Sequence, residues 1–301
     1  MSFSATDAAF EGFRVVRRHP MALIFWALFY VVIMVAALAL VGGSLIGLMG
    51  MAEDLESSGA TSPEAFMPIL ASYMTILAVI LPVSLIASAM IYAAVARSVL
   101  RPGESAFGYL RLGMDEVRVL VVSLVLCIVF VVLSAVVFGG VGAVAGMAVA
   151  SETPALWLVV VLLVCAAIAL FIWLAVRLCL AIPITMAERR IAIFDSFAFT
   201  KGRFWPLLGM VLLAGVMSIV VGLLGSLVGM PIQLATGGLE GLAGLEGESL
   251  AVILQTAWPA VAAWIVINAI MSALQVAVVY APFSAAYRDI KGLEASATTA
   301  A

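Results

Sequence analysis

Six long apolar stretches without a charged residue occupy most of this chain. They are residues Met21–Ala52, Ala65–Ala96, Val119–Ser151, Thr153–Val176, Phe204–Leu239 and Ser249–Tyr287. Each exceeds the ~20 residues with which an α-helix crosses the ~30 Å hydrocarbon layer of a membrane. Because a chain in lipid must pair its own backbone polar groups, we predict an all-α integral membrane protein, a bundle of six transmembrane helices.

The bases outside these stretches predict how the bundle is oriented. They precede the first stretch, follow the last, and lie in the second and fourth connections, whereas the other three connections contain acids but no base. These bases are Arg14, Arg17, Arg18, Arg97, Arg101, Arg111, Arg118, Arg189, Arg190, Lys201, Arg203, Arg288 and Lys291. Because Lys and Arg near the ends of spans resist translocation, we predict that both termini are cytoplasmic (N-in, C-in).

The composition excludes several other classes of protein. Hydrophobic residues make up 66% of the chain, which does not describe a soluble globular domain. The basic residues lie close to the membrane and are explained by the orientation of the spans, so we expect no nucleic-acid partner. Cys127, Cys165 and Cys179 all lie in apolar stretches, where we interpret them as buried apolar side chains, and we predict no metal and no cofactor. The first stretch stays apolar past Ala39, which favours an uncleaved span over a signal peptide.

Similar segments precede the first, third and fifth stretches. Ala9–Arg17, Ala106–Gly113 and Ile193–Lys201 each contain a Phe, a second aromatic residue two or three positions on, and then a base. As helices these segments would carry an apolar stripe opposite a charged side, so we predict short cytoplasmic amphipathic helices lying in the membrane interface.

The ends of the returning stretches also match. Pro183–Arg189 and Pro282–Arg288 both read Pro, apolar, hydroxyl, then Ala and Arg, and Tyr92–Arg97 shares the Ala-Arg ending. We therefore predict a single membrane domain, 1–301, with a threefold pseudo-repeat of units at about 1–96, 97–190 and 191–291 and a disordered tail at 292–301. The alternative is coincidence in a low-complexity apolar sequence.

Glycines four residues apart recur at the outer ends of the odd-numbered stretches. The pairs are Gly43 and Gly47, Gly142 and Gly146, and Gly225 and Gly229. Such pairs expose a groove that another helix can approach closely, which predicts helix packing at these positions.

One ionisable residue lies inside a predicted span. Arg177 is about seven residues from the cytoplasmic end of the fourth span, roughly 10 Å at 1.5 Å per residue. Ionisable groups within a membrane are costly and often functional, but this depth is also within reach of a snorkelling side chain. Asn268, Ser272 and Gln275 share one face of the sixth span. They predict either interhelical packing bonds or, with Arg177, a polar intramembrane pocket for an anionic headgroup.

The motifs of common enzymes are missing from the sequence. His19 is the single histidine, and no His-Glu-x-x-His, phosphate-binding loop or acid inside a span is present. We therefore expect no catalytic residue, and we expect that the protein is not an enzyme.

The stretch from Glu188 to Gly209 resembles an element of a bacterial membrane-protein group. That group is similar to the membrane domain attached to some glycerophosphodiester phosphodiesterases, in which a Ser, a Thr-Lys-Gly and an aromatic residue introduce a span. Ser196, Thr200-Lys201-Gly202 and Phe204 match that element, and Arg101–Arg118 is similar to a segment of uncharacterised proteins of this kind. This chain lacks the catalytic domain, so the resemblance implies a stand-alone module in the bacterial inner membrane.

Three functions fit these observations. The first is a non-enzymatic inner-membrane module that binds lipid, including anionic lipid, or a protein partner or a second copy of itself, in an envelope process. The alternative is a transporter or lipid-translocating protein that uses the polar intramembrane site. A membrane-embedded lipid enzyme ranks third.

Overall fold

The computed structural model describes residues 4–59, 62–104, 106–151, 153–235 and 250–300, and these residues form helices and connections without a strand. Six apolar stretches within its helices are long enough to cross a membrane, which confirms the predicted six-span α-helical fold. The long helices are α3 (Pro20–Ser58), α4 (Pro63–Leu100), α5 (Met114–Ser151), α6 (Pro154–Leu178), α9 (Phe204–Ala235) and α11 (Leu250–Ala300). The chain is thus an integral membrane protein.

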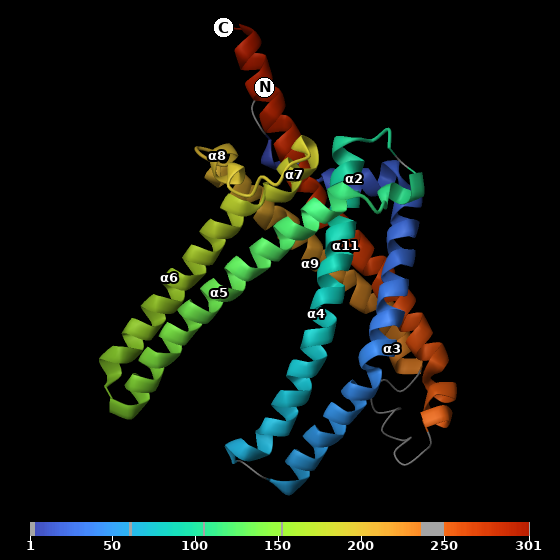
Figure 1. Ribbon diagram of the computed structural model, residues 1–301, viewed down its shortest axis with the longest axis vertical. Helices are drawn as coiled ribbons and strands as arrows, with labels where there is room; N and C mark the ends of the chain where they lie inside the picture. The colour runs from blue at the N-terminus through green and yellow to red at the C-terminus, as the bar shows by residue number, and fades with distance from the viewer. Residues whose placement is uncertain (1–3, 60–61, 105, 152, 236–249, 301) are drawn as a thin grey trace.

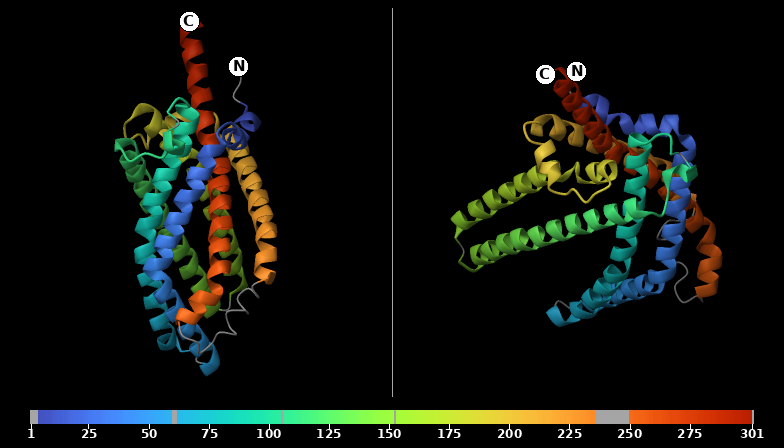
Figure 2. Two further views of the ribbon diagram at one scale, coloured as in Figure 1. Left: turned by 90° about the vertical axis from the view of Figure 1, so that its right-hand side faces the viewer. Right: turned by 45° about the horizontal axis from the view of Figure 1, so that its top comes forward.

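The long helices are arranged as three hairpins that share one end (Figure 1). Helices α3 and α4 form the first hairpin, α5 and α6 the second, and α9 and α11 the third. Helix α11 contacts α3, α4 and α9, whereas the α5–α6 hairpin diverges from the other two toward its tip (Figure 2). The helices therefore meet near one end of the molecule and separate toward the other.

Proline and glycine mark several helix boundaries. Pro20 and Pro154 begin α3 and α6, where the missing N–H of proline costs nothing, and Gly59 ends α3 with a φ of 60°. The fourth span is interrupted at Cys179 and Leu180, before α7 (Ala181–Glu188). Pro183 cannot donate a hydrogen bond to the carbonyl of Cys179, which accounts for the break.

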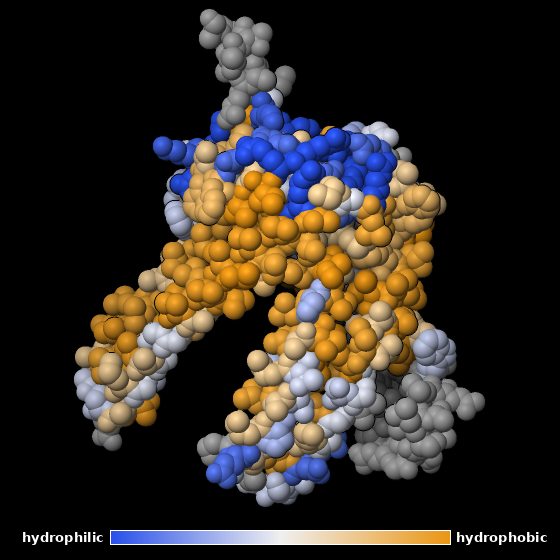
Figure 3. Space-filling view, in the orientation of Figure 1, coloured by the Kyte–Doolittle hydropathy of each residue, from blue (hydrophilic) through white to orange (hydrophobic). Residues whose placement is uncertain are grey.

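Charged residues gather at the shared end of the hairpins (Figure 3). We call this region the charged layer. It consists of α1 (Ala5–Ala9), α2 (Glu11–Arg18), the 3-10 helix η1 (Ala106–Tyr109), α8 (Asp195–Phe199) and the connections around them. Helix α11 runs through the layer and stays helical as far as Ala300, past the boundary at 291 where the sequence predicts a disordered tail.

The segments before the odd-numbered spans only partly match the predicted amphipathic helices. α2 and α8 are helical. Phe10, which precedes α2, and Phe13 within it are exposed, whereas Gly12 and Val15 are buried. The middle segment is different, because η1 covers four residues and Phe107, Gly108 and Tyr109 all have positive φ. A side chain at Gly108 would lie 2.7 Å from Phe25 Cβ, so the close packing of η1 on α3 replaces the α-helix expected there.

One predicted glycine packs closely against a neighbouring helix. A Cβ at Gly225 would lie 2.7 Å from Met271 Cγ on α11. At the other five glycines of the three pairs, no described neighbour lies within 4 Å of that position; these are Gly43, Gly47, Gly142, Gly146 and Gly229. The closest backbone approach is instead at Gly12, where a Cβ would lie 2.5 Å from Ala277 O of α11.

Candidate functional site

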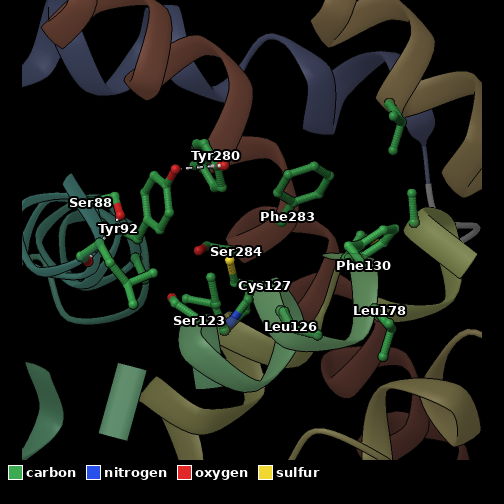
Figure 4. Close-up of a pocket in the computed structure, with 17 residues that line it drawn as sticks. Ser88, Tyr92, Ser123, Leu126, Cys127, Phe130, Leu178, Tyr280, Phe283 and Ser284 are labelled. Carbon is green, nitrogen blue, oxygen red and sulfur yellow. Dashed lines mark hydrogen bonds between the residues drawn. The ribbon is translucent and has the colours of Figure 1, made fainter. Parts of the chain in front are cut away.

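A cavity of about 380 Å³ lies below the charged layer, where the three hairpins meet (Figure 4). We call it the central cavity. Helices α4, α5, α6, α7 and α11 supply most of its walls, which are mainly aliphatic and aromatic. Its hydroxyl and thiol groups belong to Ser88, Tyr92, Ser123, Cys127, Cys179, Tyr280 and Ser284. The cavity therefore offers apolar walls with a few hydrogen-bonding groups, as small-molecule sites usually do.

Two tyrosines close one side of the central cavity. Tyr92 of α4 and Tyr280 of α11 stack with ring centroids 3.9 Å apart, and the Tyr280 hydroxyl donates to the Tyr92 hydroxyl at 2.9 Å. In Figure 4 this pair faces Ser284 and Cys127 across the cavity. The pair joins the first and third hairpins through one aromatic contact and one hydrogen bond.

The serines of the cavity differ in their hydrogen bonding. Ser88 donates to the carbonyl of Leu85, the usual way in which a helical serine satisfies its hydroxyl. Ser123 Oγ is buried and has no partner among the described residues. A buried hydroxyl without a partner costs about 1–3 kcal/mol, so Ser123 is the cavity residue with the most to gain from a ligand that accepts or donates a hydrogen bond.

The described lining of the central cavity contains no carboxylate, imidazole, ammonium or guanidinium group. General acid–base catalysis requires a group that exchanges a proton near neutral pH. The tyrosine, serine and cysteine side chains of the lining do not meet this requirement unaided.

Arg177 lies at the charged end of α6. Its Nη1 donates to Thr200 Oγ1 at 3.3 Å, and its guanidinium lies 5.8 Å from the ring centroid of Trp173. Ser196 of α8 donates to the backbone carbonyl of Arg177 at 2.6 Å. The side chain thus links the end of α8 to α6, while its Nε–H is buried without a hydrogen-bond partner among the described residues.

The polar face of the sixth span lines a separate cavity. Asn268, Ser272 and Gln275 border a space of about 350 Å³ between α9 and α11, opposite Gly222 and Gly225. The amide of Asn268 donates to Trp264 O at 2.9 Å on its own helix, and that of Gln275 lies 3.5 Å from Ser218 O on α9. These three residues share a face, as the sequence predicts.

Arg177 does not border that polar cavity. Gln275 reaches α9 at Ser218, fourteen residues after the helix begins at Phe204, which is roughly 20 Å along the axis at 1.5 Å per residue. Arg177 instead contacts Thr200, just before that beginning. The structure therefore brings Asn268, Ser272 and Gln275 together and places Arg177 at a different depth, outside the lining of the cavity that these three residues border.

Buried ion pairs in the charged layer are the feature that the sequence interpretation missed. Arg97 at the end of α4 is 2% exposed and pairs with Glu116 at the start of α5, which is 6% exposed. Arg97 also donates to the carbonyl of Tyr109 in η1. Trp26 of α3 donates to Gly108 O at 2.7 Å, so η1 ties together the first two hairpins.

The other two units also contain ion pairs, one around a buried acid and one on the surface. Glu11 is buried within 3.3 Å of Arg14 and 3.7 Å of Arg288, at the end of the sixth span. Asp195 pairs with Arg190, whose pKa is raised by the hydrogen bonds it donates to Glu188 and Asp195. Glu11 and Asp195 both follow the first Phe of their segments. That shared position was a usable signal for these pairs.

Comparison of this chain with protein-family models, with curated proteins and with solved structures finds no significant match. No family is therefore assigned, and the resemblance to the membrane domain of glycerophosphodiester phosphodiesterases stays a prediction.

Proposed function

We propose that this protein is a non-enzymatic membrane module that binds a lipid, whose hydrocarbon chain enters the central cavity. The observation that carries the proposal is an apolar cavity bounded by spanning helices, at the place where the α5–α6 hairpin leaves α4. Figure 3 shows that the surface is mainly hydrophobic where these hairpins join. In a membrane the surrounding solvent is hydrocarbon, so a lipid chain is the abundant ligand for such a space.

The hydroxyl groups of the cavity give the proposal its chemistry. A lipid with a hydroxyl, ester or amide near its polar end could form a hydrogen bond with Ser123, whose hydroxyl has no other described partner. The stacked Tyr92 and Tyr280 supply a flat aromatic wall next to these groups. We propose a bacterial inner membrane as the location, on the basis of the resemblance and of the basic charged layer.

Partly filling the cavity is expected to weaken binding of the lipid. In Ser123→Leu the larger side chain would displace about two methylene groups of the ligand at ~0.8 kcal/mol each, which lowers affinity roughly tenfold. The variant also removes the unpaired hydroxyl, so folding should be retained. Native mass spectrometry of protein released from its own membranes measures the fraction that retains lipid.

Ser84→Leu is the matched control. Ser84 lies on the exposed side of α4 and donates to Leu81 O on its own helix, outside the central cavity. It should retain as much lipid as the unmodified protein. Equal retention by the Ser123 and Ser84 variants would count against the central cavity as the site.

We further propose that the charged layer faces the cytoplasm. Ser58 at the end of α3 and Lys201 after α8 are both exposed. Each can be replaced by cysteine in a variant without native cysteines, in which Cys127, Cys165 and Cys179 are changed to alanine. A membrane-impermeant maleimide added to intact cells is expected to label Ser58→Cys, and to label Lys201→Cys after permeabilisation. Labelling of Lys201→Cys in intact cells would reverse the orientation.

Lipid translocation is the second candidate, and the polar cavity between α9 and α11 is the observation that favours it. Its amide and hydroxyl groups could form hydrogen bonds with a lipid headgroup at a site separate from the central cavity. In that case proteoliposomes should move a labelled lipid between leaflets, and Gln275→Leu should slow this movement. A binding module would show retained lipid without movement.

A further inference from the structure

A third cavity lies within the charged layer itself. It measures about 440 Å³ and is bordered by the end of α4, the connection that contains η1, the start of α5 and the end of α7. We call it the arginine pocket, because Arg97, Arg101, Arg111, Arg118 and Arg189 line it together with Glu104, Asp115 and Glu116. Five guanidinium groups and three carboxylates leave a formal charge of +2 in the lining.

The three carboxylates are already engaged with four of the arginines. Asp115 accepts from Arg118 at 2.7 Å and from Arg101 at 3.1 Å, and Glu104 accepts from Arg111 at 3.0 Å. Glu116 pairs with Arg97. The acids of the pocket therefore hold its bases in place and do not fully neutralise them.

Arg189 is the arginine left over. It ends α7 with a φ of 54°, is exposed, and has neither a hydrogen bond nor an ion pair with any residue that the structure describes. A free guanidinium at the edge of a pocket can donate two parallel hydrogen bonds to a phosphate or carboxylate.

Arg97 supplies a second, independent observation. It is 2% exposed, yet its Nε–H is buried without a hydrogen-bond partner in the described chain. This Nε lies 4.0 Å from a carboxylate oxygen of Glu104, too far for a hydrogen bond. A buried charged donor left unpaired is costly, and an anion in the pocket would provide the missing acceptor.

We infer that the arginine pocket binds a phosphate group, from a lipid headgroup or from a free phosphate compound. Arginine recognises phosphate through its planar fork of donors, and guanidinium groups from four segments converge here. Leu112 is 86% exposed and Met114 is 66% exposed at the edge of the pocket. These apolar side chains would lie against the acyl chains of a lipid whose phosphate occupies the pocket.

This site is separate from the central cavity and does not rest on it. Ala96 lines the central cavity and the next residue, Arg97, lines the arginine pocket. Ala96 packs with Val119 and Met186 in a buried cluster between α4, α5 and α7. A chain in the central cavity and a phosphate in the arginine pocket can therefore be tested independently.

The test compares two lipids with identical acyl chains, phosphatidylglycerol and diacylglycerol, added to the full protein in a maltoside detergent. Arg189→Gln is expected to weaken binding of phosphatidylglycerol about tenfold, as the loss of charge-assisted hydrogen bonds implies, and to leave binding of diacylglycerol unchanged. Arg189 has no described partner, so the variant should keep its thermal stability.

Arg190→Gln is the matched control, because Arg190 is also exposed but pairs with Glu188 and Asp195 and does not line the pocket. It should bind phosphatidylglycerol like the unmodified protein. Inorganic phosphate added as a competitor identifies the source. If it displaces the lipid, the pocket takes free phosphate; if it does not, the pocket takes a lipid headgroup.

Two results would overturn the inference. One is equal binding of phosphatidylglycerol by the unmodified protein and Arg189→Gln. The other is an equal loss in Arg189→Gln and Arg190→Gln, which would mean general attraction between basic protein and acidic lipid. The Ser123→Leu variant should keep its dependence on Arg189, so that failure of the central cavity and failure of the arginine pocket remain distinguishable.

Discussion

Replacing Glu116 with glutamine is expected to lower the free energy of unfolding by about 3–5 kcal/mol, because it leaves the buried charge of Arg97 without its partner. Arg97 and Glu116 are 2% and 6% exposed. Glutamine keeps the size of the side chain, so the loss reports charge and hydrogen bonding. At roughly 2–4 °C per kcal/mol for a chain of this size, the apparent Tm in detergent should fall by about 10 °C.

Glu104→Gln provides the comparison within the same pocket. Glu104 is 35% exposed and pairs with Arg111, which is 44% exposed. Surface pairs contribute about 0–1 kcal/mol, so this variant should change the apparent Tm by a few degrees at most. If Glu116→Gln proved as stable as Glu104→Gln, the charge of Arg97 would have to be compensated elsewhere.

The size of this expected effect follows from the position of the pair. Arg97 lies in the last turn of α4 and Glu116 in the first turn of α5. Arg97 also donates a hydrogen bond to the carbonyl of Tyr109 in η1. Trp26 of α3 holds the same short helix through Gly108. Loss of this ion pair would weaken the contact between the first and second hairpins. The arginine pocket and the adjacent wall of the central cavity, which both hairpins form, would then become less ordered.

The sequence was sufficient for the six spans, because span length and hydropathy are local properties of the chain. It was not sufficient for the partners of individual residues. The depth of Arg177 allowed either a snorkelling side chain or a functional one, and Thr200 as its partner depends on how the connection after α7 turns back over α6. Likewise the face shared by Asn268 and Gln275 was predictable, whereas the separation of that face from Arg177 was not.

The glycine pairs show the same limit. A small residue permits close approach of another helix, but only tertiary structure decides whether a helix is there. Gly225 meets Met271, whereas Gly43 and Gly142 occupy the same sequence pattern and have open space around them. The position of Glu11 after the first Phe of its segment indicated an ion pair but not its burial, since an acid near a membrane boundary has the same local sequence whether it is solvated or enclosed.

Gly12→Leu is expected to destabilise the protein by about 3 kcal/mol, the upper part of the range for overpacking. A Cβ at this position would lie 2.5 Å from both Ala277 O and Val278 Cα, which are backbone atoms of α11 and cannot rotate away. Helix α2 would have to move off α11, and Glu11 would lose its contact with Arg288.

Gly146→Leu is the matched control. No described atom lies within 4 Å of the position of its Cβ, and the higher helix propensity of leucine should stabilise the protein by about 0.5–1 kcal/mol. Thermal unfolding of both variants should therefore give shifts of opposite sign, and equal apparent Tm values would mean that α2 does not pack on α11.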